Sequence, residues 1–230
     1  MTTATAGPTE APATELETFA DIARRLGDIS PDRIIWLPRP ASEDDCGRHC
    51  EARGPAELID GFLVEKAMGF RESLLAAALI RLLGNFGTSR KLGLVGGADA
   101  IMRLRKGQLR LPEVSFITWE RLLVANAHKQ KVAPLAPDLA VEVLSEGNTR
   151  AEIDQTRREF LAAGTRLVWI IDPKARTVDV YADPTRPNEM HLVGETDALD
   201  GGAALPGFVL PLTDLFADLE PPAPPRPDSV

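Results

Sequence analysis

The chain has 230 residues, of which 44% are hydrophobic, and this composition indicates a globular protein rather than a fibrous, membrane or wholly disordered one. It carries 34 acidic and 26 basic residues, so its formal net charge is −8. A balance of this kind argues against a protein that coats DNA, RNA or an anionic membrane through its overall charge. Two cysteines are also too few for a disulfide scaffold.

The two ends of the chain differ in composition from its middle. Residues 1–13 consist largely of Thr, Ala, Pro and Glu, and residues 220–230 are about half proline, so we expect two disordered tails. The start has no basic segment followed by an apolar run, and therefore does not resemble a secretory signal. The longest apolar stretch, residues 74–83, falls well short of the roughly 20 residues of a membrane span. These features predict a cytoplasmic location without membrane contact.

Residues 14–56 form the next segment, with an amphipathic pattern over residues 14–26 that predicts a helix. The following proline-broken, acidic stretch predicts a linker or a wrapped arm. Cys46, His49 and Cys50 offer two thiols and an imidazole to a zinc ion, but a structural zinc site normally has four ligands. We therefore favour two reduced thiols in a surface loop and keep zinc as an alternative.

From Glu57 the pattern becomes that of alternating strands and helices. Residues 57–67 predict a hairpin that turns at Asp60-Gly61, a dipeptide that accepts the positive φ of a tight turn. Residues 70–86 predict a helix that ends at Gly84 and Gly87 and is apolar around nearly its whole circumference, so we expect it between two layers. Three strands separated by glycine turns are expected over residues 92–119.

The second half repeats the alternation of strand and helix. An apolar strand over residues 137–146 leads to a helix that Asn148 or Thr149 can cap, with Glu152 near the position of a capping box. Gly164 is suited to end that helix. Two more strands and a short β extension follow. This order predicts an α/β protein with one mixed sheet flanked by helices.

Two glutamates interrupt apolar strands and are the main candidates for chemistry. Glu113 lies in LPEVSFI and Glu142 in LAVEVLS. A single such residue is more often an outward-facing strand position. Two in neighbouring strands instead favour a pair of carboxylates, because buried carboxylates need a cation. Such a pair is a suitable oxygen site for Mg²⁺ or Mn²⁺ in phosphodiester hydrolysis.

The run PDLAVEVLSEGNTRAEID, continued by REFLAAGTRLVWIIDPKARTVDVY, resembles the Uma-two family of bacterial proteins classed as restriction endonucleases, within the PD-(D/E)xK nuclease superfamily. ELIDGFLVEKAMGFRESLLAAAL, GGADAIMRL and LPEVSFITWERL agree with it in the same order, so the resemblance covers roughly residues 57–181. It implies a restriction-endonuclease-like mixed sheet of four strands flanked by helices. It also implies two acidic residues that hold a divalent metal.

The resemblance assigns the catalytic and metal-binding carboxylates to Glu113 and Glu142, with Glu113 in place of the family's Asp. The superfamily lysine would fall on Leu144, or in this family on Thr156, four residues before Phe160. Neither has an amine, and a hydroxyl cannot replace one in orienting water or stabilising phosphoryl charge. Glu65, Glu72 and Asp99 lie in matching blocks and are further candidates for metal oxygens.

Arg157 and Arg158, next to Thr156, are candidate substrate-binding residues that could offset phosphate charge but cannot act as a base.

The resulting hypothesis is a cytoplasmic, Mg²⁺- or Mn²⁺-dependent DNA endonuclease with an impaired site, in a domain over residues 57–219. The alternative is a catalytically inactive protein of the same fold that binds a partner, for example a second copy of itself as a homodimer. DNA remains a suitable partner despite the net charge, because residues 101–131 carry seven bases against two acids.

Overall fold

The computed structural model describes residues 18–67, 69–217 and 219. The tails expected at 1–13 and 220–230 lie outside the described residues, as does the start of the helix expected from residue 14. Its described part is α1 (Phe19–Arg25), which begins after Thr18 with a capping box to Asp21. No helix of the described part is both long and apolar enough to cross a membrane.

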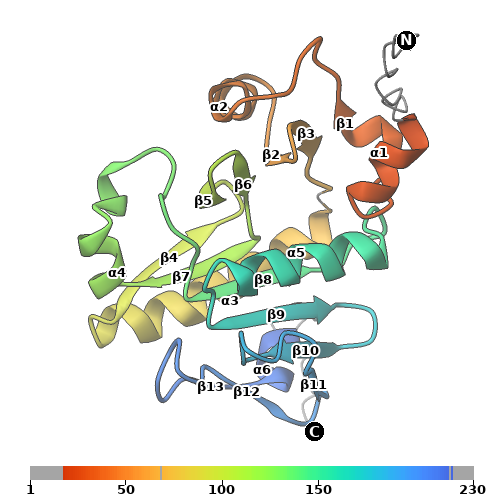
Figure 1. Cartoon of the computed structure of the whole chain (residues 1–230). Coiled ribbons are helices and arrows are strands. Elements are labelled where there is room, and N and C mark those ends of the chain that lie inside the picture. The colour runs from red at the N-terminus through yellow and green to blue at the C-terminus, as the bar shows by residue number, and fades with distance from the viewer. Residues whose placement is uncertain (1–17, 68, 218, 220–230) are drawn as a thin grey trace, which may run out of the picture.

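The main sheet has six strands in the order β11-β10-β9-β8-β7-β4 (Figure 1). They are β4 (Gly93–Gly97), β7 (Val114–Thr118), β8 (Leu139–Val143), β9 (Leu167–Asp172), β10 (Thr177–Tyr181) and β11 (His191–Val193). Neighbouring strands are antiparallel except β8 and β9, which are parallel and are joined by helix α5 (Arg150–Ala162). A parallel pair requires such a crossover, and the sheet is therefore mixed, as the sequence predicted.

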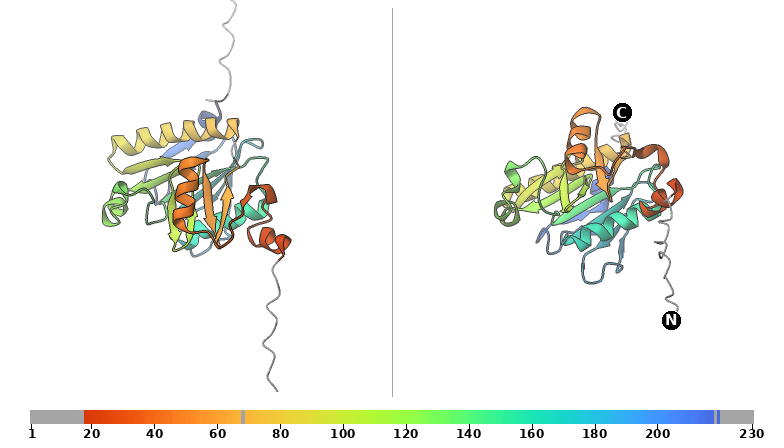
Figure 2. Two further views of the ribbon diagram at one scale, coloured as in Figure 1. Left: turned by 90° about the horizontal axis from the view of Figure 1, so that it is seen from above. Right: turned by 45° about the horizontal axis from the view of Figure 1, so that its top comes forward.

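Helices cover both faces of this sheet (Figures 1 and 2). On one face, α3 (Phe70–Ser89) and α6 (Leu212–Ala217) pack on a core that includes Phe116 and Trp169. On the other, α5 packs on Ala140 and Ile170. The expectation that α3 lies between two layers was wrong, since Phe70 on its outer side is 81% exposed. The expected ends at Gly84 and Gly87 were wrong as well, because the helix continues to Ser89 with Gly87 packed close to Phe116.

A second, antiparallel sheet of five strands lies beside the main sheet (Figure 1), where one sheet was expected. Its order is β1 (Ile34–Ile35), β3 (Phe62–Glu65), β2 (Ala56–Ile59), β6 (Gln108–Arg110) and β5 (Met102–Arg105). The hairpin was confirmed, and Asp60 and Gly61 have φ values of 47° and 83°. Residues 92–119 therefore hold four strands rather than three, because β5 and β6 pair with this hairpin.

The segment expected to be an arm belongs to the fold. Its strand β1 pairs with β3, and Ile29 and Ile34 are buried with α1 in one apolar cluster. It also contains 3-10 helix η1 (Pro31–Arg33). Burial of these apolar side chains explains why the segment wraps onto the sheet despite its prolines.

Cys46, His49 and Cys50 lie on helix α2 (Glu43–Ala52), so the expected surface loop was wrong. The side chain of Ser42 caps this helix by accepting a hydrogen bond from the backbone N–H of Asp45. Residues 43–52 contain no proline, so the helix continues through both cysteines. The thiol of Cys46 is fully buried and donates to the carbonyl oxygen of Ala56 at 3.2 Å. Within the described ranges, no group of three or more His, Cys, Asp or Glu residues is placed to hold a metal.

The elements around β8 follow the sequence prediction closely. Thr149 caps α5 and forms a capping box with Glu152, and Gly164 after the helix has a φ of 93°. The expected β extension is the pair β12 (Ala198–Asp200) and β13 (Val209–Pro211). Short helices α4 (Trp119–Val124) and η2 (Ala127–Lys129) complete the described elements.

Candidate active site

The two strand glutamates lie together at one end of the main sheet. Glu113 immediately precedes β7, and Glu142 is the fourth residue of the adjacent strand β8. The backbone N–H of Val143 donates to Oε2 of Glu113 at 3.2 Å and fixes that carboxylate against β8. Antiparallel pairing therefore brings together two carboxylates that are 29 positions apart in the sequence, counting from 113 to 142.

The ammonium group of Lys66 lies between these carboxylates. Lys66 directly follows β3 of the second sheet, and its Nζ is 2.8 Å from Oε1 of Glu113 and 3.3 Å from Oε2 of Glu142. It also donates to the carbonyl oxygen of Leu111, at the end of β6. The side chains of Lys66, Glu113 and Glu142 are 8%, 12% and 6% exposed, so this amine–carboxylate triad is largely shielded from water.

Burial and mutual contact set the charges within the triad. Burial favours the neutral form of Lys66, but the carboxylates of Glu113 and Glu142 outweigh it and raise the pKa of Lys66. Burial also disfavours ionised Glu113, yet the adjacent ammonium group lowers the pKa of Glu113 on balance. The pKa of Glu142 is raised well above its usual value by burial and by the Glu113 carboxylate. The triad therefore consists of a charged Lys66, an ionised Glu113 and a Glu142 whose carboxyl group favours the protonated form.

A second buried ion network lies next to the triad and contacts it through Leu111. Arg110, on β6, is 1% exposed and binds Glu57 at 2.6 Å and Glu159 of α5 at 2.5 Å. Glu57 in turn accepts from the backbone N–H of Leu111 at 2.9 Å. Because Leu111 supplies the carbonyl oxygen that binds Lys66, this network fixes one of the three contacts of the ammonium group. It also ties the second sheet to α5.

Glu113 reaches a small surface hollow of about 180 Å³. Glu72, Ser73 and Ala98 also line this hollow, and the carboxylate of Glu72 folds over Gly69, where a Cβ would lie 2.0 Å from its Oε2. Asp99 lines an adjacent hollow that also includes Ala98.

The side chain of Glu65 is 53% exposed and lies 3.8 Å from His49. Of the three further candidate ligands, only Glu72 shares a hollow with a triad residue.

The three helix positions proposed from the sequence lie on α5. Thr156 is buried, and within the described part of the chain it makes no hydrogen bond to the triad. Arg157 is bound to Asp154 and to Asn188 and packs over the ring of Tyr181 at 4.4 Å. Arg158 is half exposed and pairs with Asp154. The amine beside Glu113 and Glu142 thus belongs to Lys66, directly after β3, a position that the sequence interpretation did not consider.

The donor set of the triad fits a hard divalent cation. Mg²⁺ in proteins is commonly held by one or two carboxylates, with waters and substrate phosphate in its other positions. Oε1 of Glu142 is buried and accepts no hydrogen bond from the described residues. Glu113 and Glu142 would hold such an ion, and Lys66 would have to give up at least one of its ion pairs to admit it.

Comparison with known proteins agrees with this architecture. The family model Uma2, described as "Putative restriction endonuclease", matches residues 45–213. A crystal structure described as a "putative nuclease belonging to DUF820" from Anabaena variabilis superimposes with a TM-score of 0.68 at 21% sequence identity, over 79% of this chain and 100% of that chain. No curated protein matches the sequence. The fold is therefore restriction-endonuclease-like, and the chain belongs to the Uma2 family.

Proposed function

We propose that this protein is a divalent-metal-dependent endonuclease that hydrolyses DNA phosphodiester bonds slowly. The observation that carries the proposal is the position of Lys66 Nζ, 2.8 Å from Glu113 and 3.3 Å from Glu142 at the end of the main sheet. Two carboxylates and one amine are the groups that the family's chemistry requires. Here the amine comes from the residue after β3 rather than from α5.

Each residue of the triad has a role that follows from its chemistry. Glu113 and Glu142 would hold Mg²⁺ or Mn²⁺, which when bound orients the attacking water and neutralises charge on the phosphoryl oxygens. Lys66 is charged and cannot act as a base in that state, but it can donate hydrogen bonds to a phosphoryl oxygen or to the water. The backbone contacts of Val143 and Leu111 hold Glu113 and Lys66 in place before substrate arrives.

Three features support slow rather than efficient cleavage. The ammonium group of Lys66 competes with a metal ion for both carboxylates. Glu113 is one methylene longer than the Asp of the family, which displaces its oxygens in a site where Mg²⁺ demands regular geometry. Thr156 adds no amine from α5.

Glu142→Gln tests the proposal directly. Supercoiled plasmid incubated with the purified protein and Mn²⁺ should be nicked slowly, and the rate should fall by at least about 100-fold in Glu142→Gln, because an amide has no acidic proton to release and cannot become the carboxylate that a metal ion binds. Glu146→Gln is the matched control, since its side chain is 84% exposed and pairs with Lys174 beyond the end of β8. Equal cleavage by wild type and Glu142→Gln would overturn the assignment of the site.

A non-catalytic role is the second candidate, and one observation favours it: Lys66 already compensates the charge of the triad without a metal ion. Titration calorimetry with Mn²⁺ separates the two. For the endonuclease we expect a binding heat that disappears when Glu113 and Glu142 are both changed to Gln. A wild-type protein that neither binds Mn²⁺ nor nicks plasmid would instead support a partner-binding protein that keeps the nuclease fold.

A further inference from the structure

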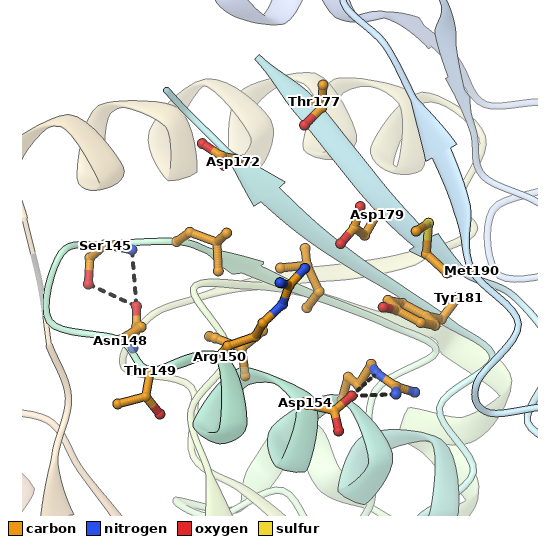
Figure 3. Close-up of a pocket in the computed structure, with 14 residues that line it drawn as sticks. Ser145, Asn148, Thr149, Arg150, Asp154, Asp172, Thr177, Asp179, Tyr181 and Met190 are labelled. Atoms are coloured by element: carbon orange, nitrogen blue, oxygen red, sulfur yellow. Dashed lines mark hydrogen bonds and ion pairs between the residues drawn. The ribbon is translucent and has the colours of Figure 1, made fainter. Parts of the chain in front are cut away.

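A larger pocket lies beside the triad, between α5 and strands β9 and β10 (Figure 3). Its volume is about 500 Å³, within the range of about 300–1,000 Å³ that is usual for small-ligand sites. Its walls come from the end of β8, the first part of α5, the sides of β9 and β10 that face α5, and Met190. We refer to it as the α5 pocket.

The α5 pocket and the triad share one end and one face of the main sheet. Leu144 lines the pocket and follows Glu142 by two residues, so their side chains project to the same face. Ile170 also lines the pocket and is the register partner of Glu142 in the parallel pair of β8 and β9. Ligands of open α/β sheets bind at the carboxyl ends of parallel strands, where both sites lie. The pocket and the triad are therefore neighbouring sites at one end of the sheet.

Two opposite charges in the α5 pocket face each other without a hydrogen bond or a close ion pair to any described residue. Arg150 projects into the middle of the pocket and Asp179 lines its β10 wall (Figure 3). Neither makes a hydrogen bond or ion pair with another described residue. In contrast, Asp154 accepts a hydrogen bond from Arg157, and Asp172 accepts hydrogen bonds from two backbone N–H groups. Arg150 is also at the start of α5, where a positive charge is unfavourable for the helix dipole. Stabilisation of α5 therefore does not explain why an arginine occupies position 150.

Asp179 is also partly buried, which makes the lack of a hydrogen-bond donor among the described residues more costly for its carboxyl group. Burial raises the pKa of Asp179, and Arg150 across the pocket opposes that rise only in part. Asp172, at the end of β9, raises it further. A donor that bound the carboxyl of Asp179 would relieve its desolvation.

An aromatic and apolar wall completes the α5 pocket. The ring of Tyr181 lies beside Met190 (Figure 3), and the guanidinium group of Arg157 packs 4.4 Å from the ring centroid. Ile153 and Ile170 provide the aliphatic part. Aromatic and arginine planes of this kind stack on nucleobases in sites for single strands.

We propose that the α5 pocket binds one nucleotide of the substrate strand, with its base against Tyr181, a base N–H on Asp179 and its phosphate on Arg150. This inference rests on the proposed function and adds a nucleotide subsite to it. A base must leave its stack to enter, so the pocket favours single-stranded or locally opened DNA over an intact duplex.

The test measures binding separately from cleavage. Fluorescence anisotropy of a fluorescein-labelled single-stranded 12-mer is recorded in EDTA, where no metal-dependent cleavage occurs. Arg150→Gln should weaken binding about tenfold, because a charge-assisted contact to phosphate is lost. The matched control Arg90→Gln removes the same charge from the C-terminus of α3 and should change the affinity less than twofold.

Competition identifies the ligand that occupies the pocket. Deoxyadenosine monophosphate should displace the 12-mer from wild type at about tenfold lower concentration than deoxyribose 5-phosphate, and Asp179→Asn should reduce this difference. Equal effects of Arg150→Gln and Arg90→Gln, or equal competition by the two phosphates, would overturn the nucleotide subsite.

A plasmid assay in parallel distinguishes the two proposals. If wild type nicks plasmid but Arg150→Gln behaves like Arg90→Gln in binding, only the subsite fails. If wild type shows the binding pattern but never nicks, the endonuclease proposal fails and nucleotide binding remains.

Discussion

Replacing Lys66 by methionine is expected to tighten Mn²⁺ binding about tenfold and to slow plasmid nicking by about 100-fold or more. Methionine has a similar length but no charge, so the carboxylates of Glu113 and Glu142 lose the cation that lies between them. A divalent ion then binds without displacing an ammonium group. The same substitution removes the donor that would stabilise phosphoryl charge. Titration calorimetry and the nicking assay measure the two effects on the same protein.

Lys131→Met is the control for this change, because the side chain of Lys131 is 88% exposed and, among the residues that the structure describes, pairs with Glu51 alone. Nicking by Lys66→Met at the wild-type rate would show that Lys66 is a counter-ion without a part in catalysis. The double variant Lys66→Met/Thr156→Lys adds a rescue, since it moves the amine to the position that the family pattern assigns to it. Recovery of nicking in the double variant would show that either element can present the amine.

The proximity of the two carboxylates of the candidate site could be predicted from the sequence, but the amine beside them could not. Glu113 and Glu142 stand out because each interrupts an apolar strand, and neighbouring strands place such residues together. Lys66 ends a hairpin, where a lysine is usually exposed, and nothing local distinguishes it from a surface residue. Its role depends on the packing of the second sheet against the main one, which local patterns do not specify. Only the position of Lys66 within the matched block ELIDGFLVEKAMGFRESLLAAAL could have drawn attention to it.

The fold shows the same division between local and non-local information. The cap at Thr149, the turn at Gly61 and the strand–helix–strand order around α5 follow from local signals, and all three were predicted. The separate second sheet was missed because β6 pairs with β2, about 50 residues earlier, through Leu58 and Leu109. Prolines in the segment before α2 left a linker or a wrapped arm open, and the burial of Ile29 and Ile34 against the hairpin favours the wrapped arm.

The ion network around Arg110 connects the second sheet to α5 and, through Leu111, to Lys66 of the triad. Arg110→Met is expected to lower the free energy of unfolding by about 3–5 kcal/mol, because it leaves the carboxylates of Glu57 and Glu159 without their buried cation. Urea unfolding followed by tryptophan fluorescence measures this change. Lys131→Met is again the control, since it breaks a surface pair with Glu51 and should cost at most about 1 kcal/mol.

A compensated variant separates loss of charge balance from loss of packing. In Arg110→Met/Glu57→Gln/Glu159→Gln no charge is left unpaired, and the amide introduced at position 57 keeps an oxygen for the backbone N–H of Leu111, so most of the lost stability should return. A loss below about 1 kcal/mol in Arg110→Met would instead show that water reaches the two carboxylates.

Because Leu111 also supplies the carbonyl oxygen for Lys66, the single variant Arg110→Met should nick plasmid more slowly even at temperatures where it stays folded. The triple variant, which restores the contact of Leu111, should regain part of that rate, and this outcome would link the buried network to the position of the ammonium group.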